Sequence, residues 1–133
     1  MDIIALGLLD WGSRPLSLWL VVPGILLWLL GNLLALWTEA VLGRSAMMGG
    51  RFALVTHGPF RWSRNPQYVG FILALAGWGL MTSSRCTLIA AAAACVPLLL
   101  VPCVEEPWLL EVYGEKYSAY SRTVPRFFRF PRR

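Results

Sequence analysis

Residues that build metal sites and acid–base networks are scarce in this sequence. Its 133 residues include one histidine, His57, and three cysteines, which fall in one apolar stretch without the spacing of metal ligands. A histidine-rich metal site is therefore excluded, and a zinc or iron centre is not expected. The cysteines are interpreted as packing residues.

Charged residues are missing from three long stretches of the chain. No Asp, Glu, Lys or Arg occurs in residues 16–38, 65–84 or 86–104, and 57% of all residues are hydrophobic. A helix rises about 1.5 Å per residue and the bilayer core is about 30 Å thick, so each stretch is long enough to span a membrane. Strands of the barrel type, with alternating apolar and polar residues, are absent. The stretches are therefore expected to be helices, which form all their backbone hydrogen bonds internally in lipid.

These features predict an all-α membrane protein with three transmembrane helices, at about 16–38, 66–84 and 86–104. Buried helices of a soluble bundle are the alternative. That alternative is disfavoured because a chain this short cannot hide three all-round apolar helices from water. No repeat, low-complexity tract or linker divides the sequence, so residues 1–133 are expected to form one domain.

Ten of the twelve basic residues lie in two segments, 44–64 and 116–133. The positive-inside rule places both segments in the cytoplasm, and it places the N-terminus and a tight turn at 83–85 outside. The apolar stretch Ile3–Leu9 is too short to span the membrane and lacks the features of a signal peptide, so it is expected at the interface. Topology and anionic lipid explain the net charge of +5, and no nucleic-acid partner is expected.

The first cytoplasmic segment, residues 52–70, is dense in polar groups. Gly58-Pro59 predicts a turn, and Asn65-Pro66 predicts the start of the second span. The free backbone N–H groups of that helix start suit an anionic group of a ligand. By composition alone, an ordinary basic loop lying on lipid headgroups is the preferred interpretation.

The second cytoplasmic segment begins with Glu105-Glu106-Pro107 at the expected membrane edge. Charges there are costly unless they have a ligand or a partner, which would make the two glutamates part of a site. An acidic pair at a helix N-terminus, favoured by the helix dipole, is an equally good explanation of the same residues. Pro107 is expected to restart a helix. A C-terminal amphipathic helix is predicted because apolar and aromatic residues recur at helical spacing at Leu109, Val112, Tyr113, Tyr117 and Tyr120.

The polar segments contain an ordered set of motifs. Leu54-Val55-Thr56-His57-Gly58-Pro59-Phe60 is followed by Arg64-Asn65-Pro66-Gln67-Tyr68-Val69-Gly70. A helical hairpin, the Glu105-Glu106 pair and an aromatic-Gly-x-x-Tyr-x-x-Tyr run at 113–120 come next, and Val124-Pro125 closes the pattern. Over residues of about 50–128 this order resembles the isoprenylcysteine carboxyl methyltransferase family and the related phospholipid N-methyltransferases.

The resemblance implies an enzyme that transfers a methyl group from S-adenosylmethionine, bound at a cytoplasmic loop, to a lipophilic or lipid-attached carboxylate, amine or thiol. By position in the motifs, Arg64 and Glu106 are expected to be catalytic: Arg64 toward an anionic acceptor or phosphate headgroup, and Glu106 as base or acceptor-orienting group. Membrane lipid is an expected partner, and the number of assembled copies is left open. The expected cofactor-binding residues are Phe52, Ala53, Leu54, Val55, Phe60, Asn65, Pro66, Gln67, Tyr68 and Glu105.

Three positions depart from the family pattern. Asn65 stands where the carboxyl methyltransferases have histidine, and Phe60 replaces a tyrosine. Val101 stands where the eukaryotic enzymes have an arginine associated with the substrate, which speaks against prenylcysteine carboxylate as the acceptor. Two other functions stay open: a membrane reductase related to sterol reductases, and a non-catalytic membrane module that recruits anionic lipid or a partner protein.

The acceptor is expected to enter from the bilayer through a lateral gap between the second and third spans, near Asn65 and Glu105. Small residues on both spans are expected to allow close helix approach up to that gap. These small residues are Gly70, Ala74, Ala76, Gly77 and Gly79 on the second span and Ala90 to Ala94 on the third.

Overall fold

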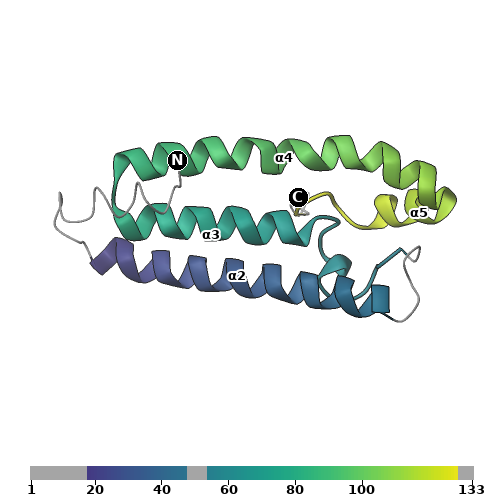
Figure 1. Ribbon diagram of the computed structural model, residues 1–133, viewed down its shortest axis with the longest axis horizontal. Helices are drawn as coiled ribbons and strands as arrows, with labels where there is room; N and C mark the ends of the chain where they lie inside the picture. The colour runs from purple at the N-terminus through teal and green to yellow at the C-terminus, as the bar shows by residue number, and fades with distance from the viewer. Residues whose placement is uncertain (1–17, 48–53, 129–133) are drawn as a thin grey trace, which may run out of the picture.

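The computed structural model describes residues 18–47 and 54–128, and within these ranges every regular element is helical. The long helices α2, α3 and α4 run side by side in alternating directions, with α3 in the middle (Figure 1). The start of α3, the end of α4 and the short helix α5 therefore lie at one end of the molecule, here called the α5 end. The elements are α2 (Leu18–Met47), the 3-10 helix η1 (Gly58–Arg61), α3 (Pro66–Thr82), α4 (Arg85–Tyr113) and α5 (Glu115–Thr123).

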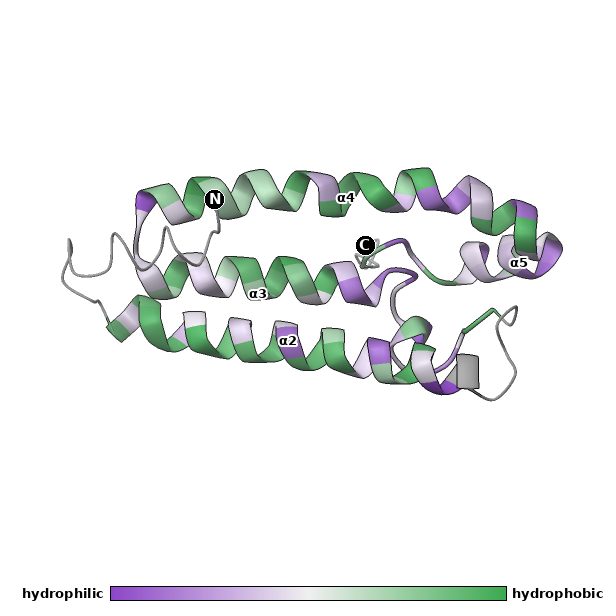
Figure 2. Ribbon diagram, viewed as in Figure 1, coloured by the Kyte–Doolittle hydropathy of each residue, from purple (hydrophilic) through white to green (hydrophobic). Residues whose placement is uncertain are grey.

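Among the described residues, two helical segments are long and apolar enough to cross a membrane, Leu18–Arg44 and Arg85–Tyr113. Many of their large apolar side chains face outward; Trp19, for example, is 90% exposed and Ile89 is 70% exposed. Figure 2 shows hydrophobic residues along most of α2, α3 and α4, and hydrophilic residues toward the α5 end. Helices that are apolar on their outer faces are typical of proteins whose solvent is lipid.

The first and third helices are longer than the predicted spans. α2 continues past Glu39 to Met47, because a charge that ends an apolar run does not end a helix. α4 passes through Pro107, so the prediction that a helix restarts there is wrong. A proline removes one backbone hydrogen bond and kinks a helix, and neighbouring turns can still continue it. The break comes at Gly114 instead, whose φ of +55° glycine adopts without strain.

The helix expected after Pro107 is thereby divided between the end of α4 and α5. The nine residues of α5 bury two side chains, Tyr117 and Tyr120. The tight turn expected between the second and third spans is confirmed: Ser83 is left-handed, with a φ of 50°, and the Ser84 hydroxyl accepts from the Thr87 N–H at 3.2 Å to cap α4.

α2 and α3 pack backbone against backbone through glycines. A Cβ atom on Gly31 would lie 2.5 Å from the carbonyl oxygen of Gly70, and one on Gly77 would lie 2.4 Å from the backbone nitrogen of Trp28 and 2.6 Å from the carbonyl oxygen of Gly24. The glycines of each helix recur two turns apart and so share one face. Gly70 and Gly77 thus face α2 rather than the third span. The expected approach to the third span is found at Gly79, where an added Cβ would lie 2.9 Å from Cδ2 of Leu88 on α4.

An apolar groove of about 520 Å³ lies where α2, α3 and α4 meet. Its lining residues lie in the middle of the helices. The groove is therefore farther from the start of α3 than the gap expected near Asn65 and Glu105. The lining residues are Trp28 of α2, Phe71, Ala74, Leu75 and Trp78 of α3, and Ala94 and Leu98 of α4.

Candidate functional site

Four segments from two distant parts of the sequence meet at the α5 end: the loop from η1 to Asn65, the start of α3, the end of α4 and the tail after α5. Prolines shape the first two of these segments. Pro59 lies in the first turn of η1, and Pro66 opens α3, where its fixed φ suits a first helical position. The chain therefore turns sharply and brings the polar residues of the loop beside α4.

Glu106 of α4 is the centre of this polar cluster. Its Oε2 accepts from Nη2 of Arg126 at 2.5 Å, and its Oε1 accepts from Nε of Arg126 at 2.7 Å. The same Oε1 lies 3.0 Å from Nη1 of Arg64, which also donates to the Tyr117 hydroxyl at 3.3 Å. The Glu106 and Arg64 side chains are only 18% and 13% exposed. One carboxylate thus joins the loop, α4 and the tail, and two guanidinium charges face its single negative charge.

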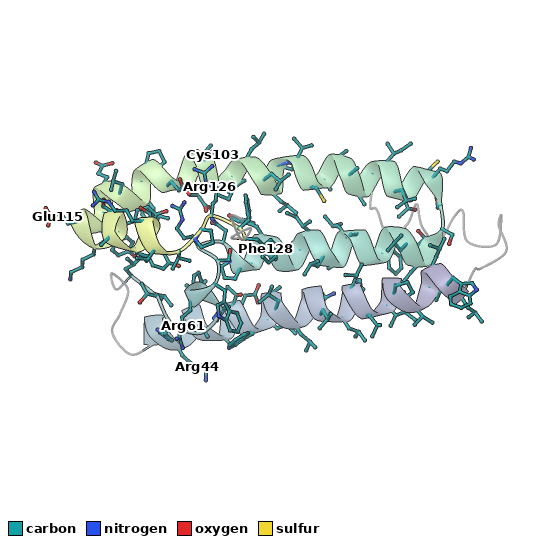
Figure 3. The ribbon with its side chains drawn as sticks, turned by 180° about the vertical axis from the view of Figure 1, so that it is seen from behind. Arg44, Arg61, Cys103, Glu115, Arg126 and Phe128 are labelled. Carbon is teal, nitrogen blue, oxygen red and sulfur yellow. The ribbon has the colours of Figure 1, made fainter. Side chains whose placement is uncertain are left out.

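The tail after α5 binds the loop through its backbone. The carbonyl oxygen of Arg126 accepts from the Ser63 hydroxyl at 3.1 Å and from the Asn65 side-chain amide at 3.0 Å. The carbonyl oxygen of Pro125 accepts from the Arg64 N–H at 2.9 Å. Figure 3 shows the Arg126 side chain beside Cys103 of α4, whose sulfur lies 3.2 Å from Nη1. Hydrogen bonding to Glu106 raises the pKa of the Arg126 guanidinium, so this residue stays charged.

Tyr120 of α5 contacts η1, and Tyr117 of α5 packs beside it. The Tyr120 hydroxyl donates to the carbonyl oxygen of Phe60 at 2.7 Å. Burial raises the pKa of Tyr120 to about 12, so the phenol keeps its proton and remains a donor at neutral pH. The ring of Tyr117 packs at a tilt against Tyr120 with 6.2 Å between centroids. α5 is therefore part of the wall of the site.

Glu105, adjacent to Glu106, has different surroundings. Its Oε1 accepts from the Tyr68 hydroxyl at 2.9 Å, and the side chain is exposed. Within residues 18–47 and 54–128, no arginine or lysine forms an ion pair with it. Glu106 is thus paired with two cations, whereas Glu105 carries its charge beside an uncharged phenol.

The Tyr68–Glu105 pair lies in line with the apolar groove. Tyr68 and the groove residue Phe71 are three apart on α3, and Glu105 and the groove residue Leu98 are seven apart on α4. Such spacings place residues on the same helix face. A ligand with a polar head and an apolar chain therefore finds both kinds of surface along one line.

The structure describes ten of the twelve predicted site residues; Phe52 and Ala53 lie outside the described ranges. Leu54 and Val55 are partly buried in the extended segment before η1. Gln67 points elsewhere, since its side-chain amide donates to Glu39 of α2 at 3.3 Å. The contacts above join Phe60, Arg64, Asn65 and Glu106 into one cluster through α5 and Arg126. Tyr68 and Glu105 contact each other, and Pro66 is buried at the start of α3.

Sequence reasoning did not identify Arg126 or Ser63 as site residues. Arg126 contributed only to the count of basic residues that set the topology. The nearest signal was Val124-Pro125, which closes the motif pattern directly before Arg126. Ser63 is buried to 5% exposure between the two motifs, and nothing in its sequence context marks it.

Comparison with known proteins matches this chain to one family model and to longer curated proteins. The model of a family described as phospholipid methyltransferase matches residues 19–116. Steroid 5-alpha-reductase DET2 of Solanum lycopersicum is 30% identical over 115 residues, which are 86% of this chain and 43% of that protein. Cobalt-zinc-cadmium resistance protein CzcN of Cupriavidus metallidurans is 36% identical over 78 residues, which are 56% of this chain and 35% of that protein. The chain spans less than half the length of these curated relatives, and no solved structure matches it.

Proposed function

This chain belongs to the phospholipid methyltransferase family, and from that premise we propose that it is an S-adenosylmethionine-dependent methyltransferase that acts on a lipophilic or lipid-attached acceptor. Family membership and the two long apolar helices support an integral membrane protein. The observation that carries the proposal is the alignment of the Tyr68–Glu105 pair with the apolar groove, beside the loop that bears the first family motif.

The residues at the α5 end fit the chemical parts of the methyl donor, which has an apolar adenine, a cationic sulfonium and an amino-acid end. Leu54 and Val55 offer partly buried apolar surface. Glu105 is a carboxylate without a cationic partner in the described part of the chain, and the ring of Tyr68 offers a face for cation–π attraction. The first turn of α3 has no side-chain cap, so its N–H groups suit a carboxylate.

When bound, the donor supplies a methyl group on an already activated sulfur. The main contribution of this chain is then to hold the acceptor in line with the methyl group and to exclude water, and such orientation can supply about 7–11 kcal/mol. Glu106 already accepts from two guanidiniums, which leaves it little capacity to take up a proton. We therefore assign Glu106 to orienting the site, and Arg64, which shares its carboxylate, to an anionic part of the acceptor such as a phosphate.

The groove supplies the place for the apolar part of the acceptor. Its lining is aliphatic and aromatic, and it leads along α3 and α4 toward Tyr68 and Glu105. An apolar chain in the groove would bring its polar head to that pair, next to the proposed donor surface. A water-soluble acceptor would have no use for this groove.

The topology that this function needs has three spans. α3 has 17 residues without a charge, a length of about 25 Å, and it packs between two longer apolar helices, so we propose that it crosses the membrane with them. The loop at η1 and the C-terminus would then be cytoplasmic and the N-terminus outside, with α5 at the cytoplasmic surface.

Cysteine labelling tests this topology. Arg85 and Glu115 are both exposed; Arg85 begins α4, and Glu115 begins α5 just beyond the other end of α4. In a variant without Cys86, Cys95 and Cys103, a cysteine at position 85 should react with a membrane-impermeant reagent from outside, and one at position 115 only after the cytoplasmic side is opened. Labelling of both positions from the same side would contradict three spans.

The function is tested by binding and by transfer. Purified protein should bind S-adenosylhomocysteine saturably, and native membranes given donor with a labelled methyl group should place the label in the lipid extract. Absence of binding would remove the methyltransferase assignment. Label confined to water-soluble product would remove the lipophilic acceptor and leave the assignment standing.

A reductase is the second candidate, because the steroid 5-alpha-reductase named above matches 86% of this chain. A parallel titration with a reduced nicotinamide dinucleotide phosphate separates the two. Saturable binding of the nicotinamide compound, with none of S-adenosylhomocysteine, would favour the reductase.

A further inference from the structure

We propose that Arg126 is a positioning residue that fastens the C-terminal tail over the loop before α3 and thereby shapes the donor-binding surface. The inference rests on the proposed function, because the surface that it shapes is the one assigned to the methyl donor. Arg126 does not itself touch the reacting atoms in this proposal.

The side chain and the backbone of Arg126 contact different parts of the site. Its guanidinium forms a bidentate pair with Glu106 of α4, a geometry that fixes orientation as well as distance. Its backbone carbonyl accepts from both Ser63 and Asn65 of the loop. The side chain therefore anchors to a rigid transmembrane helix while the main chain holds the loop, and Pro125 adds a third contact to the same loop.

The contact between Arg126 and Asn65 determines which groups at the start of α3 are available to a ligand. An asparagine before a helix ordinarily caps it by accepting from the N–H groups of the first turn. Here the Asn65 side chain makes no such cap and donates its amide to Arg126 instead. The N–H groups of α3 stay available to a ligand as long as the tail holds Asn65. If the tail loosens, Asn65 is free to turn back and cap α3, in competition with the anionic end of the donor.

The charges of the cluster allow this role to be tested without unfolding the site. Glu106 is shared between Arg126 and Arg64. Loss of the Arg126 guanidinium leaves Glu106 paired with Arg64, so no buried carboxylate is stranded. A variant at position 126 is therefore expected to insert into the membrane and fold, but its tail would no longer be anchored to Glu106 of α4.

The test compares Arg126→Met and Arg126→Lys with Arg122→Met, a control for loss of an exposed arginine on neighbouring α5. Arg126→Met should raise the KM for the donor about tenfold, the factor made by about 1.4 kcal/mol, with little change in kcat. Arg126→Lys should recover part of the loss, since an ammonium can pair with Glu106 but not in bidentate fashion. Without any ligand, amide hydrogen exchange of residues 60–68 should be faster in Arg126→Met than in wild type, and Arg122→Met should match wild type in both measurements.

Unchanged exchange of residues 60–68 in Arg126→Met would overturn the proposal, as would a donor KM equal to that of wild type. A parallel fall of kcat, donor affinity and melting temperature in both Arg126 variants, without recovery by lysine, would also overturn it in favour of a purely structural role. If wild type binds no S-adenosylhomocysteine, the proposed function fails. The exchange measurement then still decides whether Arg126 holds the loop.

Discussion

Replacing Gly77 by alanine is expected to disrupt the packing of α2 against α3. The new Cβ would lie 2.4 Å from the backbone nitrogen of Trp28 and 2.6 Å from the carbonyl oxygen of Gly24. Both of these neighbours are main-chain atoms of a helix, so they cannot rotate away as the end of a side chain can. Overpacking of a well-packed interior costs about 1–3 kcal/mol, and the backbone contacts place this site at the upper end. The melting temperature in detergent should fall accordingly.

Gly43 provides the matched control for the Gly77 variant. It lies in the same helix pair, on α2, and a Cβ atom there would have no neighbour within 4 Å. Gly43→Ala should leave stability unchanged or raise it by up to about 1 kcal/mol, because alanine is the better helix former. Equal melting temperatures for Gly77→Ala and Gly43→Ala would contradict the close helix contact.

Replacing Glu105 by glutamine is expected to weaken donor binding strongly. The carboxylate has no cationic partner among the described residues, so in the proposed function its charge serves the cationic part of the ligand. Hydrogen bonds to charged groups contribute about 1.5–3 kcal/mol, which corresponds to a loss of affinity of about 10- to 150-fold. Calorimetric titration with S-adenosylhomocysteine measures the change.

The fold should survive this substitution, because the glutamine carbonyl oxygen can still accept from the Tyr68 hydroxyl. Glu111→Gln is the control, since Glu111 is also on α4 and is exposed. It should bind the donor as wild type does. Unchanged affinity in Glu105→Gln would take Glu105 out of the binding site and return it to the interpretation as an acidic residue favoured by a helix terminus.

The contacts of residues 54–70 argue against an ordinary basic loop in this part of the chain. A loop that only lies on headgroups would direct its polar groups outward. Ser63 is buried instead, and the side chains of Arg64 and Asn65 are engaged with α4, α5 and the tail. Buried, mutually paired polar groups hold a defined conformation, which is a requirement of a binding site rather than of a lipid-facing loop.

The sequence by itself determined the helices and the turn at Ser83–Ser84. Uncharged runs of this length must satisfy their backbone hydrogen bonds locally in lipid, so their composition is enough to predict helices. The positions of the two motifs and of the glutamate pair were also readable, since each is local. The helix ends were harder to predict. Pro107 suggested a break, but the helix ends at Gly114, because of the backbone conformation of that glycine.

Only the tertiary structure decided the partners of these residues. Both acids of the pair look alike in the sequence, yet Glu106 meets Arg64 and Arg126 while Glu105 meets Tyr68. Gly70 and Gly77 of α3 face α2, where a matching pair of glycines lies, whereas Gly79 faces Leu88 of α4. The loop and tail contacts join residues about sixty positions apart, such as Asn65 and Arg126, which are 61 apart. Local periodicity carries no information about such pairs, because they depend on how the helices are packed and not on the spacing within any one of them.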